Sequence, residues 1–306
     1  MIRPIFIAFA VLSLFAGCSG KSSQNLVENP YLERARDLSL DGMAAMQRER
    51  WSAAERAFSR ALLAAQLSDD AALVRLSWYN LGVVRSAMNQ MDAATEAFRR
   101  SMALAERQGD PVMRVRAGLA LALMQVRHQK EVDTISVPDI SLPADVHLQR
   151  GRLAQLLGDP KLADKSYHFA IAKSTNTAGG LKITADAYMG LALLYHRAGD
   201  DAAARKDLDK ALSIAREIGT PRLIAHALLL SGSITDSPLQ KKDQFERALS
   251  IYTAMEDLRG QRETLEFLQQ VAVVEGDREE LERIRLRIES LSSTAVVTPQ
   301  AGGEGR

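Results

Sequence analysis

The chain has 306 residues, of which 46% are hydrophobic and 5% aromatic, with 39 basic and 38 acidic side chains and a formal net charge of +1. This length and composition allow a sizeable buried core, and the near-neutral charge gives no overall electrostatic case for nucleic acid as a partner. The single cysteine, Cys18, excludes an intramolecular disulfide and a cysteine-based metal site.

The N-terminal segment has the pattern of a signal peptide. Arg3 supplies a positive start, and residues 5–16 form an unbroken run of apolar and small residues. A run of about 12 residues suits a signal peptide and is well short of the roughly 20 residues that a membrane-spanning helix needs. The run ends in Phe15-Ala16-Gly17-Cys18.

These residues resemble the lipobox of bacterial lipoproteins, in which the chain is cut before the cysteine and the thiol receives a diacylglycerol. That family prefers leucine three places before the cysteine, where Phe15 stands here. The resemblance implies a signal peptide at 1–17 and lipidation of Cys18, and Ser19 is similar to the residue of lipoproteins sorted to the outer membrane. An ordinary secretory signal, or an uncleaved anchor with an incidental cysteine, is the alternative.

The next segment is polar and lacks periodicity. Its sequence, SGKSSQNLVENP, is rich in serine and asparagine. We therefore expect residues 18–32 to form a flexible linker between the lipid and a folded domain at 33–291.

The central region repeats a pattern at intervals of about 40 residues. Trp78, Leu81 and Gly82 stand in a W-x2-L-G arrangement, followed by Ala94, Phe98 and Ser101. The same spacing recurs in three other stretches, at Gly42, Ala54, Phe58 and Ala61; at Gly151, Ala163, Tyr167 and Ala170; and at Ala192, Ala204, Leu208 and Ala211. A further stretch, at Gly232, Phe245 and Ala248, follows the pattern with about three residues missing from the turn. Small residues at these places let helices approach closely, and the aromatic ring fills the remaining gap.

This pattern resembles the tetratricopeptide repeat, in which a helix, a tight turn and an antiparallel helix form one unit. The resemblance implies an all-α fold: a right-handed α-solenoid of about six repeats, some degenerate. The Gly-Asp pairs at Gly158, Gly199 and Gly276 are typical of a helix that stops and restarts. The family's usual interval is 34 residues, so either the helices or the joining loops are longer here.

One segment interrupts the series. Residues 130–143 contain two prolines and several β-branched residues, without a helical period. They stand where the second helix of the third repeat is expected. Long loops inside compact arrays are often functional, but a degenerate repeat that merely crosses to the next one is equally compatible with this sequence. After Leu291 the sequence SSTAVVTPQAGGEGR lacks a helical face, which predicts a disordered tail at 292–306.

The sequence shows no motif of an enzyme or a cofactor site. Its five histidines are scattered, and there is no HExxH, GxSxG, GxGxxG or GxxxxGK[ST]. The aspartates at 69–70 and 200–201 stand at expected helix starts, where carboxylates accept hydrogen bonds from free amides. We therefore expect no enzyme, no metal, no cofactor other than the lipid on Cys18, and no small-molecule substrate.

The resemblance implies that the first helix of each pair lines a concave face that can bind an amphipathic helix or an extended peptide. The side chains expected on this peptide-binding face are Arg36, Met43, Leu76, Tyr79, Asn80, Val83, Arg116, Leu119, Leu123, Arg152, Met189 and His226. The alternative is that some of the apolar members belong to the core.

Some members of the family hold a C-terminal carboxylate with a set of lysine, asparagine and arginine residues. Asn80 and Arg116 fall on two of those places, but Ser39, Met43 and Ala120 stand on the others and cannot substitute. We do not expect that clamp.

The sequence as a whole resembles the bacterial outer-membrane tetratricopeptide lipoproteins. This implies a non-enzymatic scaffold for protein–protein interactions, lipid-anchored in the outer membrane, facing the periplasm and assisting the assembly of an envelope complex. The expected partner is another envelope protein or peptide segment, with the membrane contacted through the lipid. The alternative is a regulatory lipoprotein that binds and modulates a cell-wall enzyme. An enzyme in its own right would need a polar pocket with convergent titratable groups.

Overall fold

The structure is a computed structural model that describes residues 29–48, 50–130, 132, 137 and 141–296. Within these residues it contains thirteen helices and no strand. Six pairs of consecutive helices form hairpins, and α5 (Pro111–Arg127) has no partner of its own. The hairpins are α1 (Pro30–Gln47) with α2 (Trp51–Leu67), α3 (Ala71–Ala87) with α4 (Met91–Arg107), α6 (Ala144–Leu156) with α7 (Pro160–Lys173), α8 (Ala178–Arg197) with α9 (Asp201–Glu217), α10 (Pro221–Ile234) with α11 (Pro238–Ala254), and α12 (Leu258–Glu275) with α13 (Arg278–Val296).

The interval of 40 residues comes from the length of the helices. Helices α2 to α5 have 17 residues each, and turns of three residues join them. In each of these turns the middle residue has a positive φ, at Asp69 (55°), Asn89 (60°) and Gly109 (65°), and the turn between α8 and α9 has the same feature at Gly199 (83°). This conformation ends one helix and lets the next begin at once.

An aspartate usually follows the residue with positive φ and caps the next helix. Asp70, Asp110 and Asp200 each accept a hydrogen bond at 2.9 Å from the amide three residues ahead. The predicted stop and restart at Gly158 is confirmed, since Gly158 has φ 77° and Asp159 caps α7 in the same way. A residue with positive φ followed by a capping aspartate thus ends one helix and begins the next.

The two helices of a pair meet where glycine faces an aromatic ring. A Cβ atom at Gly82 would lie 2.6 Å from the ring of Phe98, and one at Gly42 would lie 2.6 Å from that of Phe58. Both rings are almost wholly buried. The helix backbones can approach this closely because glycine leaves room for the ring, which is the packing that the sequence pattern predicted.

The third repeat has a first helix but no second one among the described residues. Lys130, Ser141, Leu142 and Pro143 are not helical, and Leu142 is buried beside α5 and α6 with Val132 and Val137 packed against the same cluster. The turn before them keeps the positive φ at Gln129 (53°), but the next residue is Lys130 where the other turns usually have a capping aspartate. Apolar side chains of 130–143 therefore occupy part of the place that a second helix holds elsewhere.

The folded part extends beyond both predicted limits of 33 and 291. Helix α1 begins at Pro30, inside the segment expected to be a linker, because Asn29 caps it and proline suits the first helical position. Helix α13 continues to Val296, inside the predicted tail, because no proline stands before residue 299 to stop it. The predicted signal peptide at 1–17, Cys18 and residues 297–306 lie outside the described residues.

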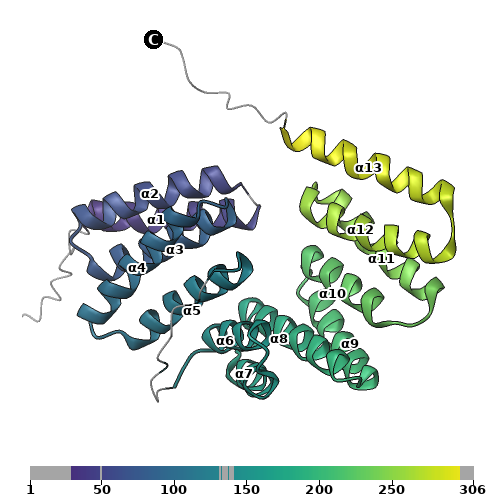
Figure 1. Ribbon diagram of the computed structural model, residues 1–306. Coiled ribbons are helices and arrows are strands. Elements are labelled where there is room, and N and C mark those ends of the chain that lie inside the picture. Colours follow the sequence, from purple (N-terminus) through teal and green to yellow (C-terminus); the bar gives the residue numbers. More distant parts are fainter. Residues whose placement is uncertain (1–28, 49, 131, 133–136, 138–140, 297–306) are drawn as a thin grey trace, which may run out of the picture.

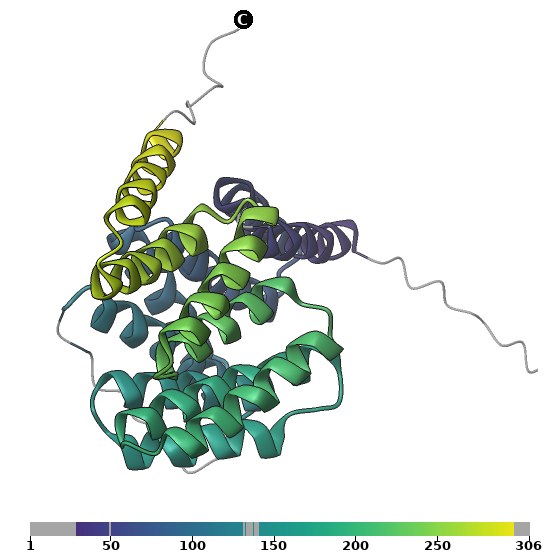
Figure 2. The same ribbon diagram turned by 90° about the vertical axis from the view of Figure 1, so that its right-hand side faces the viewer.

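The hairpins stack side by side in a curved array with two layers (Figure 1). First helices of successive repeats contact each other: α1 with α3, α3 with α5, α6 with α8, and α8 with α10. Because the inside of a bend is its shorter side, this closer layer is the concave face of the solenoid. Figure 2, turned by 90°, shows the same stack with α13 projecting at one end.

Candidate functional site

The concave face of the first helices, here called the inner face, carries most of the side chains predicted to bind a peptide. Met43 on α1 and Leu76 on α3 are 43% and 38% exposed. Arg36 is exposed as well, and a larger set is half-buried: Tyr79, Asn80, Val83, Arg116, Leu123, Arg152 and His226. The peptide-binding role of these residues remains a prediction.

Two of the predicted residues lie in the core instead. Leu119 is 1% exposed, because α6 packs directly against α5 where the second helix of the third repeat is missing. Met189 is 2% exposed and packs with α9 and α10. Neither side chain can contact a ligand on the inner face, so the prediction was wrong for these two.

A polar cluster joins three first helices at the middle of the inner face. The Arg116 guanidinium on α5 makes two bonds to Asp145 on α6, at 2.8 and 3.0 Å. The amide Nε2 of Gln149 on α6 donates to the hydroxyl of Tyr79 on α3 at 3.2 Å. Burial raises the pKa of Tyr79, so this hydroxyl is neutral at physiological pH. The cluster fixes the relative positions of α3, α5 and α6.

Arginine–aspartate pairs of this kind recur along the inner face. Each runs from one first helix to the next or to the residue that caps it: Arg75 to Asp110 (2.8 Å), Arg116 to Asp145 (2.8 Å), Arg152 to Asp186 (3.0 Å) and Arg222 to Asp257 (3.1 Å). Arg116 and Arg152 are among the residues predicted to bind a peptide. The signal in the sequence is an arginine in a first helix with an aspartate 29 to 35 residues later.

His226 occupies the C-terminal part of the inner face. Its pKa is lowered by burial, which outweighs the opposite effect of Asp186 on α8 and Glu263 on α12. The imidazole is therefore mostly neutral at pH 7 and can act as donor or acceptor in a hydrogen bond. Asp186 also pairs with Arg152 on α6 at 3.0 Å, and Asp186 and His226 line the same cavity between α8 and α10.

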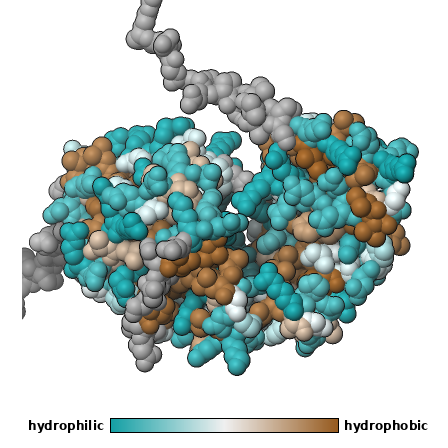
Figure 3. Space-filling view, viewed as in Figure 1, coloured by the Kyte–Doolittle hydropathy of each residue, from teal (hydrophilic) through white to brown (hydrophobic). Residues whose placement is uncertain are grey.

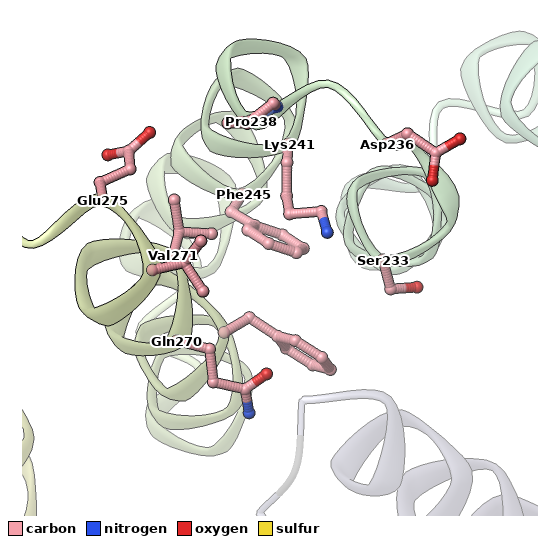
Figure 4. A pocket seen from close by; sticks show the side chains of 10 residues that line it. Ser233, Asp236, Pro238, Lys241, Phe245, Gln270, Val271 and Glu275 are labelled. Atoms are coloured by element: carbon pink, nitrogen blue, oxygen red, sulfur yellow. The ribbon is translucent and has the colours of Figure 1, made fainter.

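A cavity of about 290 Å³, lined by apolar and by polar side chains, lies between α10, α11 and α12 (Figure 4). Phe245 and Phe267 stack there with ring centroids 5.3 Å apart, and Val271 completes the wall. Figure 4 shows Lys241 extending over Phe245, with Asp236 and Glu275 at the rim. The cavity is large enough for one aromatic or branched side chain of a ligand. The sequence pattern singled out Phe245 as a repeat residue but did not indicate this cavity.

Removal of the Tyr79 hydroxyl tests the contact between α3 and α6. We expect Tyr79→Phe to lower the free energy of unfolding by about 0.5–1.5 kcal/mol, because Gln149 loses its partner. Urea unfolding followed by circular dichroism measures this. Tyr31→Phe serves as the control, since Tyr31 is 47% exposed. An equal effect of both substitutions would show that the bond between Tyr79 and Gln149 does not hold the helices together.

Two features of the described part of the chain bear on function. No three histidine, cysteine, aspartate or glutamate side chains of these residues gather into a group that could hold a metal ion. None of the described helices has the length and apolar character that crossing a membrane requires.

The stacked hairpins and their concave inner face define the class of the protein, an α-solenoid. Residues 77–108 and 143–217 each match a family model described as tetratricopeptide repeat. The second match spans α6 to α9 and the first covers most of α3 and α4. The chain therefore contains tetratricopeptide repeats.

A solved structure with a TM-score above 0.5 agrees with this fold. A Rap protein complexed with competence and sporulation factor is 12% identical with a TM-score of 0.59, over 88% of this chain and 78% of that one. BtubC (BKLC) from P. vanneervenii is 14% identical with a TM-score of 0.46, over 91% of this chain and 97% of that one. No curated protein sequence matches the chain. Tetratricopeptide repeats are interaction modules that are generally non-catalytic, so they imply a protein or peptide partner.

Proposed function

We propose that the protein is a lipid-anchored scaffold of the bacterial cell envelope that holds a segment of a partner protein on its inner face. The observation that supports the binding role is a pair of exposed apolar side chains on the first helices, Met43 and Leu76, together with hydrogen-bonded polar groups at Tyr79 and Arg116 on the same face. In such a groove the apolar side chains contribute most of the binding free energy, and polar groups held in place fix the position of the bound segment along the groove.

The envelope location rests on the N-terminal sequence. In this proposal the signal peptide at 1–17 is removed, Cys18 carries the lipid, and the solenoid faces the periplasm from the outer membrane. Several acyl chains give firm anchoring where a single chain is marginal. The anchored solenoid then assists the assembly of an envelope complex by holding one of its members near the membrane.

One substitution on the inner face tests the binding role. We expect Leu76→Asp to lower the yield of a specific partner at least tenfold in pull-downs from detergent-solubilised envelopes, because a charge would replace an apolar contact. Leu63→Asp is the matched control, since Leu63 is 58% exposed on α2 in the outer layer. Both sites are solvent-accessible, so both variants should keep the fold. A partner captured equally by both would refute binding on the inner face.

The anchor is tested separately. Cells fed radiolabelled palmitate should label the wild-type protein and leave Cys18→Ala unlabelled, and the variant should leave the membrane fraction. Labelling that persists in the Cys18→Ala variant would contradict lipidation at this residue, without bearing on the inner face.

A further inference from the structure

The cavity between α10, α11 and α12 exists because α10 is short. Helix α3 continues to Ala87, five residues beyond Gly82, whereas α10 ends at Ile234, only two residues beyond the equivalent Gly232. Helix α10 therefore lacks most of one turn at its C-terminal end. Helix α12 keeps 18 residues, and the cavity lies between its last turns and the end of α10.

Exposed apolar side chains gather around this cavity. Val274, in its wall, is 83% exposed, and Leu239, next to the lining residue Pro238, is 80% exposed. No other large hydrophobic side chain of the described residues is exposed to this degree. Figure 3 shows hydrophobic residues gathered on the right of the molecule, where Figure 1 places α11 and α12. Exposed apolar groups beside a cavity are typical of a binding site.

The cavity is continuous with the inner face. Its side walls belong to the first helices α10 and α12, and Figure 4 shows Phe245 and Lys241 pointing from α11 into the space between them. Ser233, which lines the cavity, follows His226 on α10 after seven residues, so the two lie on one side of that helix about 10 Å apart. A segment bound beside His226 would therefore reach the cavity at the end of α10.

The size and charges of the cavity define what it can hold. Its volume of about 290 Å³ is at the lower limit of small-molecule pockets, which favours a single side chain over a larger ligand. The stacked rings of Phe245 and Phe267 form an apolar wall, and the stem of Lys241 extends over Phe245. The carboxylates of Asp236 and Glu275 stand on opposite sides of the rim, and both residues are exposed. Residues that flank the bound side chain would meet these carboxylates.

The C-terminal residues of this chain cannot fill the cavity with an apolar side chain. The cavity lies beside the second half of α12, near the turn to α13, and α13 ends at Val296, about 27 Å from that turn. Val297 and Pro299 extend at most about 11 Å beyond Val296. This distance favours a partner over the C-terminal residues as the source of the bound side chain.

We propose that the cavity binds an aromatic or branched apolar side chain of the partner segment, and that basic residues next to this side chain pair with Asp236 and Glu275. The inference rests on the proposed function, because it assumes that the inner face holds a polypeptide. The bound side chain anchors the segment at one edge of the inner face. The two carboxylates discriminate against segments in which acidic residues flank the anchor.

The test follows valine methyl groups of the full mature chain by NMR during titration with three capped tripeptides, Lys-Phe-Lys, Lys-Ala-Lys and Glu-Phe-Glu. We expect Lys-Phe-Lys to shift the signals of Val271 and Val274. It should bind about tenfold more tightly than Lys-Ala-Lys, because the cavity removes its ring from water. Glu-Phe-Glu should bind about threefold more weakly than Lys-Phe-Lys at low salt, and added salt should reduce this difference.

Three variants make the result specific. Ser233→Leu fills part of the cavity from its wall and should weaken the binding of Lys-Phe-Lys at least about fivefold. Asp236→Asn/Glu275→Gln should remove the difference between the two phenylalanine peptides. The matched control is Asp92→Asn/Glu106→Gln, which changes two exposed carboxylates of the second helix α4 and should leave every affinity within about twofold. Valine signals away from the cavity that stay in place show that each variant keeps the fold.

Three results would overturn the inference: equal affinity for Lys-Phe-Lys and Lys-Ala-Lys, methyl shifts confined to valines away from the cavity, or equal effects of the two carboxylate double variants. Signals of Val274 that change with protein concentration, or on deletion of residues 19–28, would also overturn it, because a second copy or the N-terminal segment would then be the occupant. A partner that is lost with Leu76→Asp but retained with Ser233→Leu would leave the proposed function standing and the anchor refuted.

Discussion

Replacement of Tyr167 by alanine is expected to lower the free energy of unfolding by about 3–5 kcal/mol. Tyr167 on α7 is 1% exposed and lies between glycines of two first helices. Cβ atoms at Gly151 on α6 and Gly190 on α8 would lie 2.7 and 2.4 Å from its ring. Removal of the ring leaves a cavity where three helices meet. Urea unfolding measures the loss.

Further variants separate the hydroxyl bond of Tyr167 from the packing of its ring. Burial raises the pKa of Tyr167 to about 12, so its hydroxyl remains a donor, and it donates to Oε1 of Gln155 at 2.6 Å. Tyr167→Phe should therefore cost only about 1 kcal/mol. Gly190→Ala should cost about 1–3 kcal/mol in the wild type despite the better helix propensity of alanine, and clearly less beside Tyr167→Leu. Equal costs in both backgrounds would contradict a steric origin.

Replacement of Asp257 by alanine is expected to have the second-largest effect, a loss of about 2–3 kcal/mol. Asp257 is 7% exposed and serves two purposes at once. It accepts a hydrogen bond at 2.9 Å from the amide of Gly260, which caps α12, and its other oxygen pairs with Arg222 on α10 at 3.1 Å. The cap stabilises the start of α12, and the ion pair holds the last hairpin to the preceding one. Because stability in a repeat array depends on contacts between neighbours, hydrogen exchange should increase mainly in α12 and α13.

The control for this prediction is a cap without an ion pair. Asp159 caps α7 through the amide of Leu162 at 2.9 Å and is exposed. Asp159→Ala should cost only about 1 kcal/mol, and Asp257→Asn should retain the cap while it loses the charge. If the alanine variants at 159 and 257 lost equal stability, the pair with Arg222 would have no net stabilising effect.

The local features of the fold could be predicted from the sequence because they depend on neighbouring residues. The phase of the repeats follows from small residues opposite aromatic ones, and the contacts of Gly82 with Phe98 and of Gly151 with Tyr167 confirm it. The turn at Gly158 was predictable because it needs positive φ followed by a capping side chain. The limits at 33 and 291 were set too far inward, since hydrophobic period alone misses the cap at Asn29 and the polar last turns of α13.

The site was harder to predict because it depends on the relative positions of distant helices. Leu119 follows the periodicity of an inner-face residue, but α6 covers it. Helix α6 can pack there because the described part of the third repeat has no second helix. Tyr79 and Gln149 belong to different repeats, and only the curvature with which the repeats stack brings their side chains within 3.2 Å of each other. A pattern within one repeat contains no information on that curvature.

The length of the helices sets the width of the inner face. A first helix of 17 residues, such as α3 or α5, is about 26 Å long at 1.5 Å per residue. An extended strand that runs parallel to the helices therefore crosses from one row of turns to the other in about eight residues. A strand that runs across the helices instead meets a new first helix about every 8–10 Å, or every two to three residues. The direction in which a partner lies thus determines which residues it contacts. A partner parallel to the helices contacts one repeat along the whole length of its first helix, and a partner across them contacts several repeats one after another.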